Sequence, residues 1–459
     1  MGILTNQRNA ERPKALFEFT QGVDVDARLA SHEVRVQKAW AKALAQARIL
    51  DADEAAKISG ALDEALSLIR AGGFEWRVED EDVHMNLERF VTEKAGSLGK
   101  KMHTGRSRND LIATTLRLFV HASVSETAQA VRQLALALVQ RAEKDLDVLV
   151  PGLTHVQHGQ PIRHGHVLAG HAWAFARDLE RLQIAATRAL AAMPLGAAAL
   201  AGTTLELDFS KLARDLGFAS PCLNSYDAVG DRDFMIEAID AFASVALHLS
   251  RLSEDCIYWS STAVGLVKLP KDWSTGSSIM PNKRNPDVPE LTRGKSAHVI
   301  AAATNAHALV KALPTSYDSD LHELKGVYLR AFDQLGECLA VFPYFVAGLE
   351  PDPAKAERLL KTGHILATEV ADELARNGVP FREAYAQVAA LVERAEAQGV
   401  QIEDLGQSDW AKHAPKLPAD FPKKLGARSA VERRSAPGGT SLAQAQAGIA
   451  ALKDRLAGT

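Results

Sequence analysis

The chain has 459 residues, a formal net charge of −4 and three cysteines. This length allows a large core divided among two or three domains, and the small net charge excludes an overall bias toward nucleic acid or anionic membranes. The cysteines are odd in number and widely spaced (Cys222, Cys256 and Cys338). That spacing excludes a disulfide framework and a compact CxxC metal site, and it suits a reducing cytoplasm.

The beginning of the chain, residues 1–14, is polar and has no apolar signal-peptide core. The most continuous apolar stretch, residues 296–313, is interrupted by two histidines, an asparagine and a lysine. Because a membrane span needs ~20 mostly apolar residues, we interpret this stretch as a buried helix. We expect a soluble, cytoplasmic protein without a membrane segment.

Helical periodicity dominates the chain. Between residues 231 and 259, apolar and small side chains recur in alternating steps of four and three: Met235, Ile239, Phe242, Ala246, Leu249, Ser253 and Cys256. Residues 168–189 repeat the pattern, and residues 112–142 and 288–313 are similar. Such narrow apolar stripes predict a bundle of long helices with surplus apolar surface, which favours oligomerisation. The alternative is that the stripes only fill the core of a monomer.

Strand signals are few. Residues 203–209 are a candidate for a short extended segment, and no alternation of strands and helices indicates a parallel sheet. Turn-forming residues interrupt the helical pattern near residues 96–105, 151–161, 194–202, 268–286 and 349–353. The last of these breaks contains Pro351 and Pro353 and predicts a domain boundary.

Four polar clusters interrupt the helical pattern, as expected for a site built at the ends of a bundle. The first is HTGRSRND at residues 103–110. A helix start with two arginines, Arg106 and Arg108, makes an anion site suited to carboxylates. The alternative is a helix cap by Asn109 or Asp110 with solvated arginines, and the spacing alone does not separate the two.

The second cluster, residues 154–161, contains Thr154, His155 and His158, and three more histidines follow it by residue 171. A metal site is the less favoured interpretation, because no Asp or Glu lies between these histidines and their spacing matches no compact zinc signature. A histidine next to a threonine in a polar break is better suited to proton transfer or substrate orientation.

The third cluster is GSSIMPNKRNP at residues 276–286, the signature loop. Its glycine and serines supply flexibility and hydroxyl groups, Lys283, Arg284 and Asn285 supply charge and hydrogen-bond donors, and two prolines restrict it. Such a loop is able to close over an anionic substrate and bring a hydroxyl group to the reacting carbon. The alternative is a surface linker. The segment is too short for a nucleic-acid patch and has no interleaved aromatic residues.

The fourth cluster is YDSDLHELK at residues 317–325, an acid-rich turn that enters another helix. Taken alone, this segment also fits a capped helix start with solvated charges.

The signature loop resembles the GSSxMPxKxNP signature of the fumarase/aspartase superfamily of lyases. Within that superfamily, EDVHMNLE at residues 81–88 and the first cluster are similar to the argininosuccinate lyase family, whereas fumarases, aspartases and adenylosuccinate lyases differ at the first cluster. Further segments fit the same family: Thr154-His155 with Gln160-Pro161-Ile162, NSYD at 224–227, RDF at 232–234, GVPFREA at 378–384 and GGT at 438–440.

The resemblance implies a lyase that cleaves argininosuccinate to L-arginine and fumarate by β-elimination of a C–N bond, in arginine biosynthesis. Ser277 is then the general base, with Lys283 and backbone dipoles stabilising its ionised form. His155 takes part in proton transfer to the leaving guanidino group, with Glu290 as its charge partner. Which of the two is the acid, and whether water intervenes, is left open.

The resemblance also implies a substrate-binding set: Ser107, Arg108, Asn109, Thr154, Asn285, Tyr317, His322 and Lys325. Lys283 and Asn285 hold the succinyl carboxylates together with residues of the first two clusters. Tyr317 and Lys325 contact the substrate mainly toward its arginine end. No metal, nucleotide or organic cofactor is implied, because the base, the acid and the electrostatic stabiliser are all protein groups.

The implied fold is all-α and fumarase/aspartase-like, with an N-terminal helical domain (1–106), a central bundle of long helices (107–350) and a C-terminal helical domain (351–459). The implied assembly is a homotetramer in which each active site draws residues from three subunits. Neither nucleic acid nor a membrane is an expected partner.

Three departures bear on the substrate. His322 stands where the family usually has Gln, and Asp318 stands where Asn commonly follows the tyrosine. Residues 15–20 read ALFEFT instead of containing the common LWGGRF opening, so no binding residue is assigned there. The rival interpretations are a superfamily lyase acting on another N-substituted aspartate and a non-enzymatic, crystallin-like scaffold. The presence of Ser277 and His155 argues against the second.

Overall fold

The computed structural model describes residues 13–458. The chain divides into two compact units, each assembled from three segments. Unit 1 comprises the residues up to 129 with 180–246 and 297–336, and unit 2 comprises 130–179, 247–296 and the residues from 337 on. The boundaries fall inside long helices, so each long helix contributes residues to both units. The three consecutive domains expected from the sequence stay a prediction.

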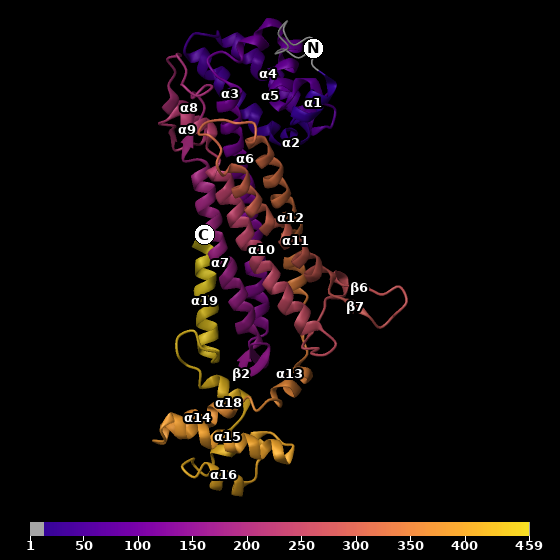
Figure 1. Ribbon diagram of the computed structural model, residues 1–459, viewed down its shortest axis with the longest axis vertical. Helices are drawn as coiled ribbons and strands as arrows, with labels where there is room; N and C mark the ends of the chain where they lie inside the picture. The colour runs from indigo at the N-terminus through magenta and orange to yellow at the C-terminus, as the bar shows by residue number, and fades with distance from the viewer. Residues whose placement is uncertain (1–12, 459) are drawn as a thin grey trace. The chain divides into compact units, whose positions relative to one another are not determined.

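Five long helices dominate the fold, which confirms the expected all-α class: α6 (Arg108–Lys144), α7 (His164–Ala189), α10 (Asp233–Ser260), α11 (Asp287–Val310) and α12 (Leu321–Ala347). Within each unit their segments lie side by side (Figure 1). In unit 1, Tyr328 on α12 contacts the other helices, since its hydroxyl lies 2.6 Å from Ser123 Oγ on α6 and its ring packs against Phe242 on α10.

The remaining helices of unit 1 are shorter than these five: α1 (Lys14–Thr20), α2 (Val23–Asp26), η1 (Ala27–Leu29), α3 (Ala30–Gln46), α4 (Ala52–Arg70), η2 (Val78–Asp80), α5 (Val83–Ala95), η3 (Gly96–Lys101), α8 (Phe209–Leu216) and α9 (Ser225–Gly230). Those of unit 2 are η4 (Lys271–Trp273), α13 (Pro353–Leu360), α14 (Ala367–Arg376), α15 (Phe381–Gln398), η5 (Ile402–Asp404), α16 (Gln407–His413), α17 (Phe421–Lys424), α18 (Ala427–Glu432) and α19 (Leu442–Gly458).

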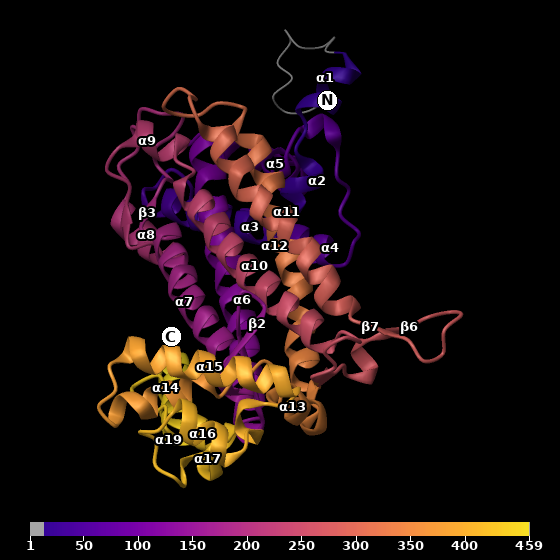
Figure 2. The same ribbon diagram turned by 60° about the horizontal axis from the view of Figure 1, so that its bottom comes forward.

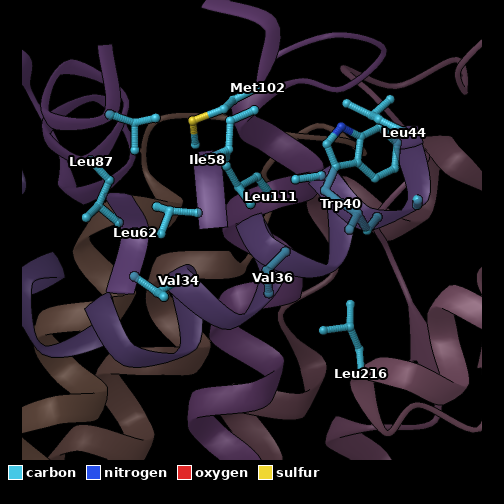
Figure 3. Packing of buried hydrophobic residues seen from close by; sticks show 14 of the residues in the cluster. Val34, Val36, Trp40, Leu44, Ile58, Leu62, Leu87, Met102, Leu111 and Leu216 are labelled. Carbon is cyan, nitrogen blue, oxygen red and sulfur yellow. The ribbon is translucent and has the colours of Figure 1, made fainter. Parts of the chain in front are cut away.

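The core of unit 1 lies among α3, α4, α5 and the beginning of α6. Figure 3 shows Trp40 and Leu44 of α3 and Ile58 and Leu62 of α4 in this core, all buried. The start of α4 is set locally: Asp51 accepts a hydrogen bond from Glu54 N, and the Glu54 side chain accepts one from Asp51 N. This reciprocal capping box satisfies amides that have no partner inside the helix. A second apolar cluster in unit 2 joins α14, α15 and α16.

All described strands form two-stranded ladders. The longest is the hairpin of β1 (Leu149–Thr154) and β2 (Gln157–Arg163), which is antiparallel with Thr154 opposite Gln157. The others are β3 (Ala192–Met193) with β4 (Ser220–Pro221), β5 (Val267–Lys268) with β8 (Glu350–Pro351), and β6 (Thr275–Gly276) with β7 (Arg284–Asn285).

Two sequence predictions about local structure are wrong. Residues 203–208 form no strand; they are irregular with a bend, and Phe209 begins α8, where the Asp208 side chain accepts a hydrogen bond from Lys211 N. The helix expected within 296–313 exists as part of α11, but in the single chain this helix is largely exposed, with Leu291 63 % and Ile300 40 % exposed. Val299 and Ala306 of this helix are buried, whereas Leu291 and Ile300 lack a cover within the described chain.

Candidate active site

Residues from the first and fourth polar clusters line one cavity in unit 1, the unit 1 cavity, which has a volume of about 830 Å³. Of the predicted binding residues, Arg108, Asn109, Tyr317 and His322 line it. They come from segments about 200 residues apart in sequence, and the fold brings these two clusters together within one chain. The remaining lining includes six acidic residues: Glu79, Asp80, Glu81, Asp82, Asp320 and Glu323.

Asp110, the last residue of the first cluster, stabilises the start of α6. Its carboxylate is fully buried and accepts hydrogen bonds from the backbone N–H groups of Ser107, Gly196 and Ala198 at 2.9–3.0 Å. Burial raises the pKa of the Asp110 carboxyl, and the amide hydrogen bonds oppose that rise. Asp110 thus ties the helix start to the 194–202 loop, and Asn109 Nδ2 donates to Ala199 O in the same loop.

The two arginines of the first cluster have carboxylate or amide partners within unit 1. Arg108 Nη1 lies 2.9 Å from Asp82 Oδ2 and 3.0 Å from Glu81 Oε2. Arg106 is buried and donates to Gln37 Oε1. Arg108 is the arginine at the cavity wall, so it is the one placed to reach a substrate, and an incoming carboxylate would compete with Glu81 and Asp82 for its guanidinium group.

Lys325 is not among the residues that line the cavity. The Lys325 side chain is 4 % exposed and its ammonium group lies 2.5 Å from Asp26 Oδ1, and the Asp26 side chain is fully buried. Direct substrate contact by Lys325 therefore stays a prediction. Asp26 is a residue that the sequence did not single out, because it lies in the N-terminal segment where the family pattern is altered. The EDVHMNLE segment was recognised, but no role was assigned to Glu81 or Asp82.

The altered family position, His322, faces the cavity from the first turn of α12. Burial, and then the positive charge of Lys325, lower the pKa of His322 from 6.5 to about 4. Burial also raises the pKa of the neighbouring Tyr317 hydroxyl. Both side chains are therefore neutral near neutral pH, so His322 adds a hydrogen-bonding group to the acidic cavity without adding a charge.

The lowered pKa of His322 predicts a stability change with pH. Between about pH 6.5 and pH 4 the unfolded chain binds a proton at His322 that the folded chain does not, so folding stability falls as the pH falls through this window. We compare how far the free energy of unfolding falls between about pH 7 and pH 5. We expect it to fall by about 1–2 kcal/mol more in the unsubstituted chain than in His322→Gln. Urea unfolding at both pH values measures this, and identical losses in both proteins would contradict it.

The second cluster lies at the tip of the β1–β2 hairpin in unit 2. Thr154 and His155 are exposed, and the two turn residues, His155 and Val156, have φ values of +55° and +60°. A two-residue hairpin turn with φ positive at both positions usually contains Asn and Gly, and a β-branched residue there is strained. Strain of this kind is concentrated at functional sites. The turn holds His155 at the end of the hairpin, open to a ligand.

The signature loop connects β6 to β7 in unit 2 and extends away from α11 (Figures 1 and 2). Ser277 Oγ accepts hydrogen bonds from Met280 N at 3.1 Å and Ile279 N at 3.4 Å. These amide dipoles favour a negative charge on that oxygen. The base of the loop is fixed by Thr275, whose hydroxyl donates to Asp287 Oδ2 at 2.5 Å at the start of α11. Asn285 Nδ2 lies 3.5 Å from Thr275 Oγ1.

Several predicted catalytic side chains do not contact one another in the described part of the chain. Lys283 is exposed in the signature loop and Glu290 is exposed in the first turn of α11. Within residues 13–458, the side chains of His155, Lys283 and Glu290 form no hydrogen bond or ion pair. The assistance of Ser277 by Lys283 and the pairing of His155 with Glu290 therefore stay predictions.

Among the described residues, no group of three or more His, Cys, Asp or Glu side chains is placed to hold a metal ion. No helix of the described part of the chain has the length and apolar character needed to cross a membrane.

Comparison with known proteins decides the family. A family model described as "Lyase" matches residues 7–301, and one described as "Argininosuccinate lyase C-terminal" matches residues 364–432. The chain is 43% identical over 443 residues to the argininosuccinate lyase of Frankia casuarinae, covering 96% of this chain and 95% of that protein. The chain belongs to the argininosuccinate lyase family. The Nitratidesulfovibrio vulgaris member is 42% identical, covering 95% of this chain and 94% of its own length.

Solved structures agree on the fold of this family member. EDDS lyase in complex with formate matches with a TM-score of 0.81 and 25% identity, covering 100% of this chain and 92% of that one. Class II fumarase from Schistosoma mansoni matches with a TM-score of 0.74 and 17% identity, covering 87% and 89%. The expected fumarase/aspartase-like fold is confirmed.

Proposed function

We propose that this chain is a carbon–nitrogen lyase that cleaves argininosuccinate to L-arginine and fumarate. The unit 1 cavity carries the substrate assignment. It joins Arg108 and Asn109, which suit a carboxylate, to six acidic residues, which suit a guanidinium or ammonium group. Argininosuccinate bears both kinds of group. Family membership along nearly the whole chain supports the same substrate and a role in arginine biosynthesis.

The reaction begins with removal of a weakly acidic proton next to a carboxylate. Ser277 is the proposed base, since its oxygen already accepts two backbone N–H groups that would stabilise the alkoxide. Lys283 adds positive charge when the signature loop closes. The resulting dianionic intermediate is stabilised by Lys283, Asn285, Thr154, Ser107 and Asn109 as donors to the succinyl carboxylates.

The second half of the reaction breaks the C–N bond. The electron pair of the carbanion forms the C=C bond of fumarate, and the pair of the C–N bond goes to the guanidino nitrogen. His155, with Glu290 as its charge partner, moves a proton to that nitrogen, and L-arginine leaves with its guanidinium group charged. His155 is exposed at the hairpin tip. The other residues of its proposed site would therefore come from outside the hairpin.

We also propose a homotetramer with shared active sites. The long helices expose apolar side chains that another copy would cover, among them Ile184, which is 57 % exposed, Leu247, which is 50 % exposed, and Leu291, which is 63 % exposed. Sites assembled from several subunits explain why the signature loop and the hairpin present unpaired side chains in one chain. The reaction uses only small soluble compounds, which fits a cytoplasmic location.

The test is argininosuccinate turnover by the purified chain, followed by the ultraviolet absorbance of fumarate. We expect fumarate and L-arginine in equal amounts. Fumarate from a different succinyl adduct but none from argininosuccinate would assign another N-substituted aspartate as the substrate. Absence of product from every such adduct would favour the crystallin-like scaffold.

A further inference from the structure

The segment that leads into the signature loop, residues 266–276, is fixed to the chain that follows α12. We call this segment the loop stem, and all of it lies in unit 2. Its strand β5 pairs with β8, which places Lys268 opposite Glu350. Asp352 N also donates to Leu266 O at 2.7 Å. The beginning of the loop stem is therefore held by backbone pairing to the residues just after α12.

Further along the loop stem, Pro270 packs closely against Gly348, which follows the last residue of α12. A Cβ atom at Gly348 would lie 2.7 Å from Pro270 Cβ. Carbon atoms do not approach this closely without a shift of one chain, so the packing depends on a glycine at this position. The loop stem thus stays against the end of α12 for several residues.

The next contact is between two aromatic rings. Trp273 in η4 and Tyr344 near the end of α12 stack with their centroids 5.6 Å apart and their planes within 8° of parallel. Aromatic pairs favour such offset parallel packing. Tyr344 is 62 % exposed, so the core of unit 2 does not require an aromatic side chain there. The ring of Tyr344 does, however, hold the ring of Trp273.

Beyond Trp273 the contacts of the chain change. Thr275 N and Thr275 Oγ1 donate to Asp287 Oδ2 at 3.1 Å and 2.5 Å, and β6 pairs with β7. Within the described chain, the hydrogen bonds of residues 277–283 stay inside the loop, among them Met280 N to Ser277 Oγ. The loop extends away from α11 (Figure 2). The direction of its base therefore depends on the contacts made before Thr275.

We propose that Trp273 and Tyr344 are positioning residues for the lyase reaction. Their stack fixes the direction in which β6 and β7 leave the end of α12, and so sets where Ser277 lies when it acts. Only three residues separate Trp273 from Ser277, so a turn of the Trp273 backbone moves the proposed base. The inference rests on the proposed function, in which Ser277 removes the substrate proton. A misplacement of ~1 Å is enough to lower a rate by ~10²-fold.

Steady-state rates of fumarate release test the role of the stack. We expect Tyr344→Ala to lower kcat by about tenfold or more. KM should stay within about twofold, because the residues of the unit 1 cavity are untouched. Tyr344→Phe keeps the ring and should keep kcat within about twofold. Tyr385→Ala is the matched control, since Tyr385 on α15 is 67 % exposed and lies outside the loop stem; its kcat should not change.

Trp273→Ala provides the other half of the test. We expect it to lower kcat as Tyr344→Ala does, and the double variant should lose no more than either single variant, because the stack is already absent in each. Losses in kcat that multiply in the double variant would overturn the proposal. A loss in Tyr344→Phe as large as that in Tyr344→Ala would also overturn it, since the hydroxyl group and not the ring would then be responsible.

Amide hydrogen exchange of residues 274–286, followed by mass spectrometry, tests the anchoring without turnover. We expect exchange about threefold to tenfold faster in Tyr344→Ala, the range expected for the loss of one aromatic pair, and unchanged exchange in Tyr344→Phe and Tyr385→Ala. Unchanged exchange in Tyr344→Ala, or full kcat in that variant, would overturn the proposal and leave the proposed function intact. If the unsubstituted chain does not cleave argininosuccinate, the proposed function fails, and the exchange rates alone decide whether the stack anchors the loop.

Discussion

Replacing Ser277 with alanine is expected to lower kcat for argininosuccinate cleavage by about 10³-fold, within the ~10²–10⁴-fold range that a positioned general base contributes. The substitution removes the oxygen proposed to take the proton, together with its two backbone hydrogen bonds. KM should change little, because the binding residues of the unit 1 cavity are untouched. Initial rates of fumarate release over a range of substrate concentrations measure both constants.

Ser278→Ala is the matched control, since it removes a hydroxyl group from the neighbouring exposed residue of the same loop. We expect its kcat to stay within about twofold to threefold of the unsubstituted chain, because surface substitutions away from special contacts have small effects. A Ser277→Ala variant that retains full kcat would refute Ser277 as the base, while leaving the lyase family assignment intact. A large loss in Ser278→Ala instead would move the base to that residue.

The long helices were predictable because each buries a stripe of side chains that recur with the spacing of an α-helix. The seam from Met235 to Cys256 lies on α10, and every one of these apolar residues is buried. The β1–β2 hairpin was not predictable in this way. Its strands contain Pro151, Gly152 and Pro161, which are poor strand formers, and its turn has His155 and Val156 at positive φ. Pairing with the opposite strand, and not local preference, determines this element.

The sequence indicated which polar clusters to examine for a site, but not which charged residues lie next to them. The first and fourth clusters meet in the unit 1 cavity, and the joining of the second and third clusters to them in one active site stays a prediction. The partner of Lys325 was not foreseeable, because Asp26 lies 299 residues away in sequence and in no recognised motif. Periodicity reports which face of a helix is buried, whereas a single long-range ion pair leaves no repeated pattern in the sequence.

The buried pair of Asp26 and Lys325 predicts a large loss of stability when either residue is replaced alone. Both side chains are almost fully removed from water, and their charged atoms lie 2.5 Å apart. Asp26→Asn would leave the ammonium group of Lys325 buried without an opposite charge. We expect a loss of about 3–5 kcal/mol in the free energy of unfolding, the usual cost of removing one partner of a buried ion pair. Urea titration at fixed protein concentration measures it.

Lys325→Met should be similarly destabilising, because it leaves the Asp26 carboxylate buried without its partner. The double variant, Asp26→Asn with Lys325→Met, is expected to recover most of the loss, since replacing both charges of a buried pair is often nearly neutral. The two single variants and the double variant together form a double-mutant cycle. If the free-energy losses of the single variants add up to much more than the loss of the double variant, the two residues act as one unit. Additive losses would contradict the pairing. An exposed pair of the same unit, Lys38 and Asp63, provides the comparison, because its cycle should give no more than about 1 kcal/mol.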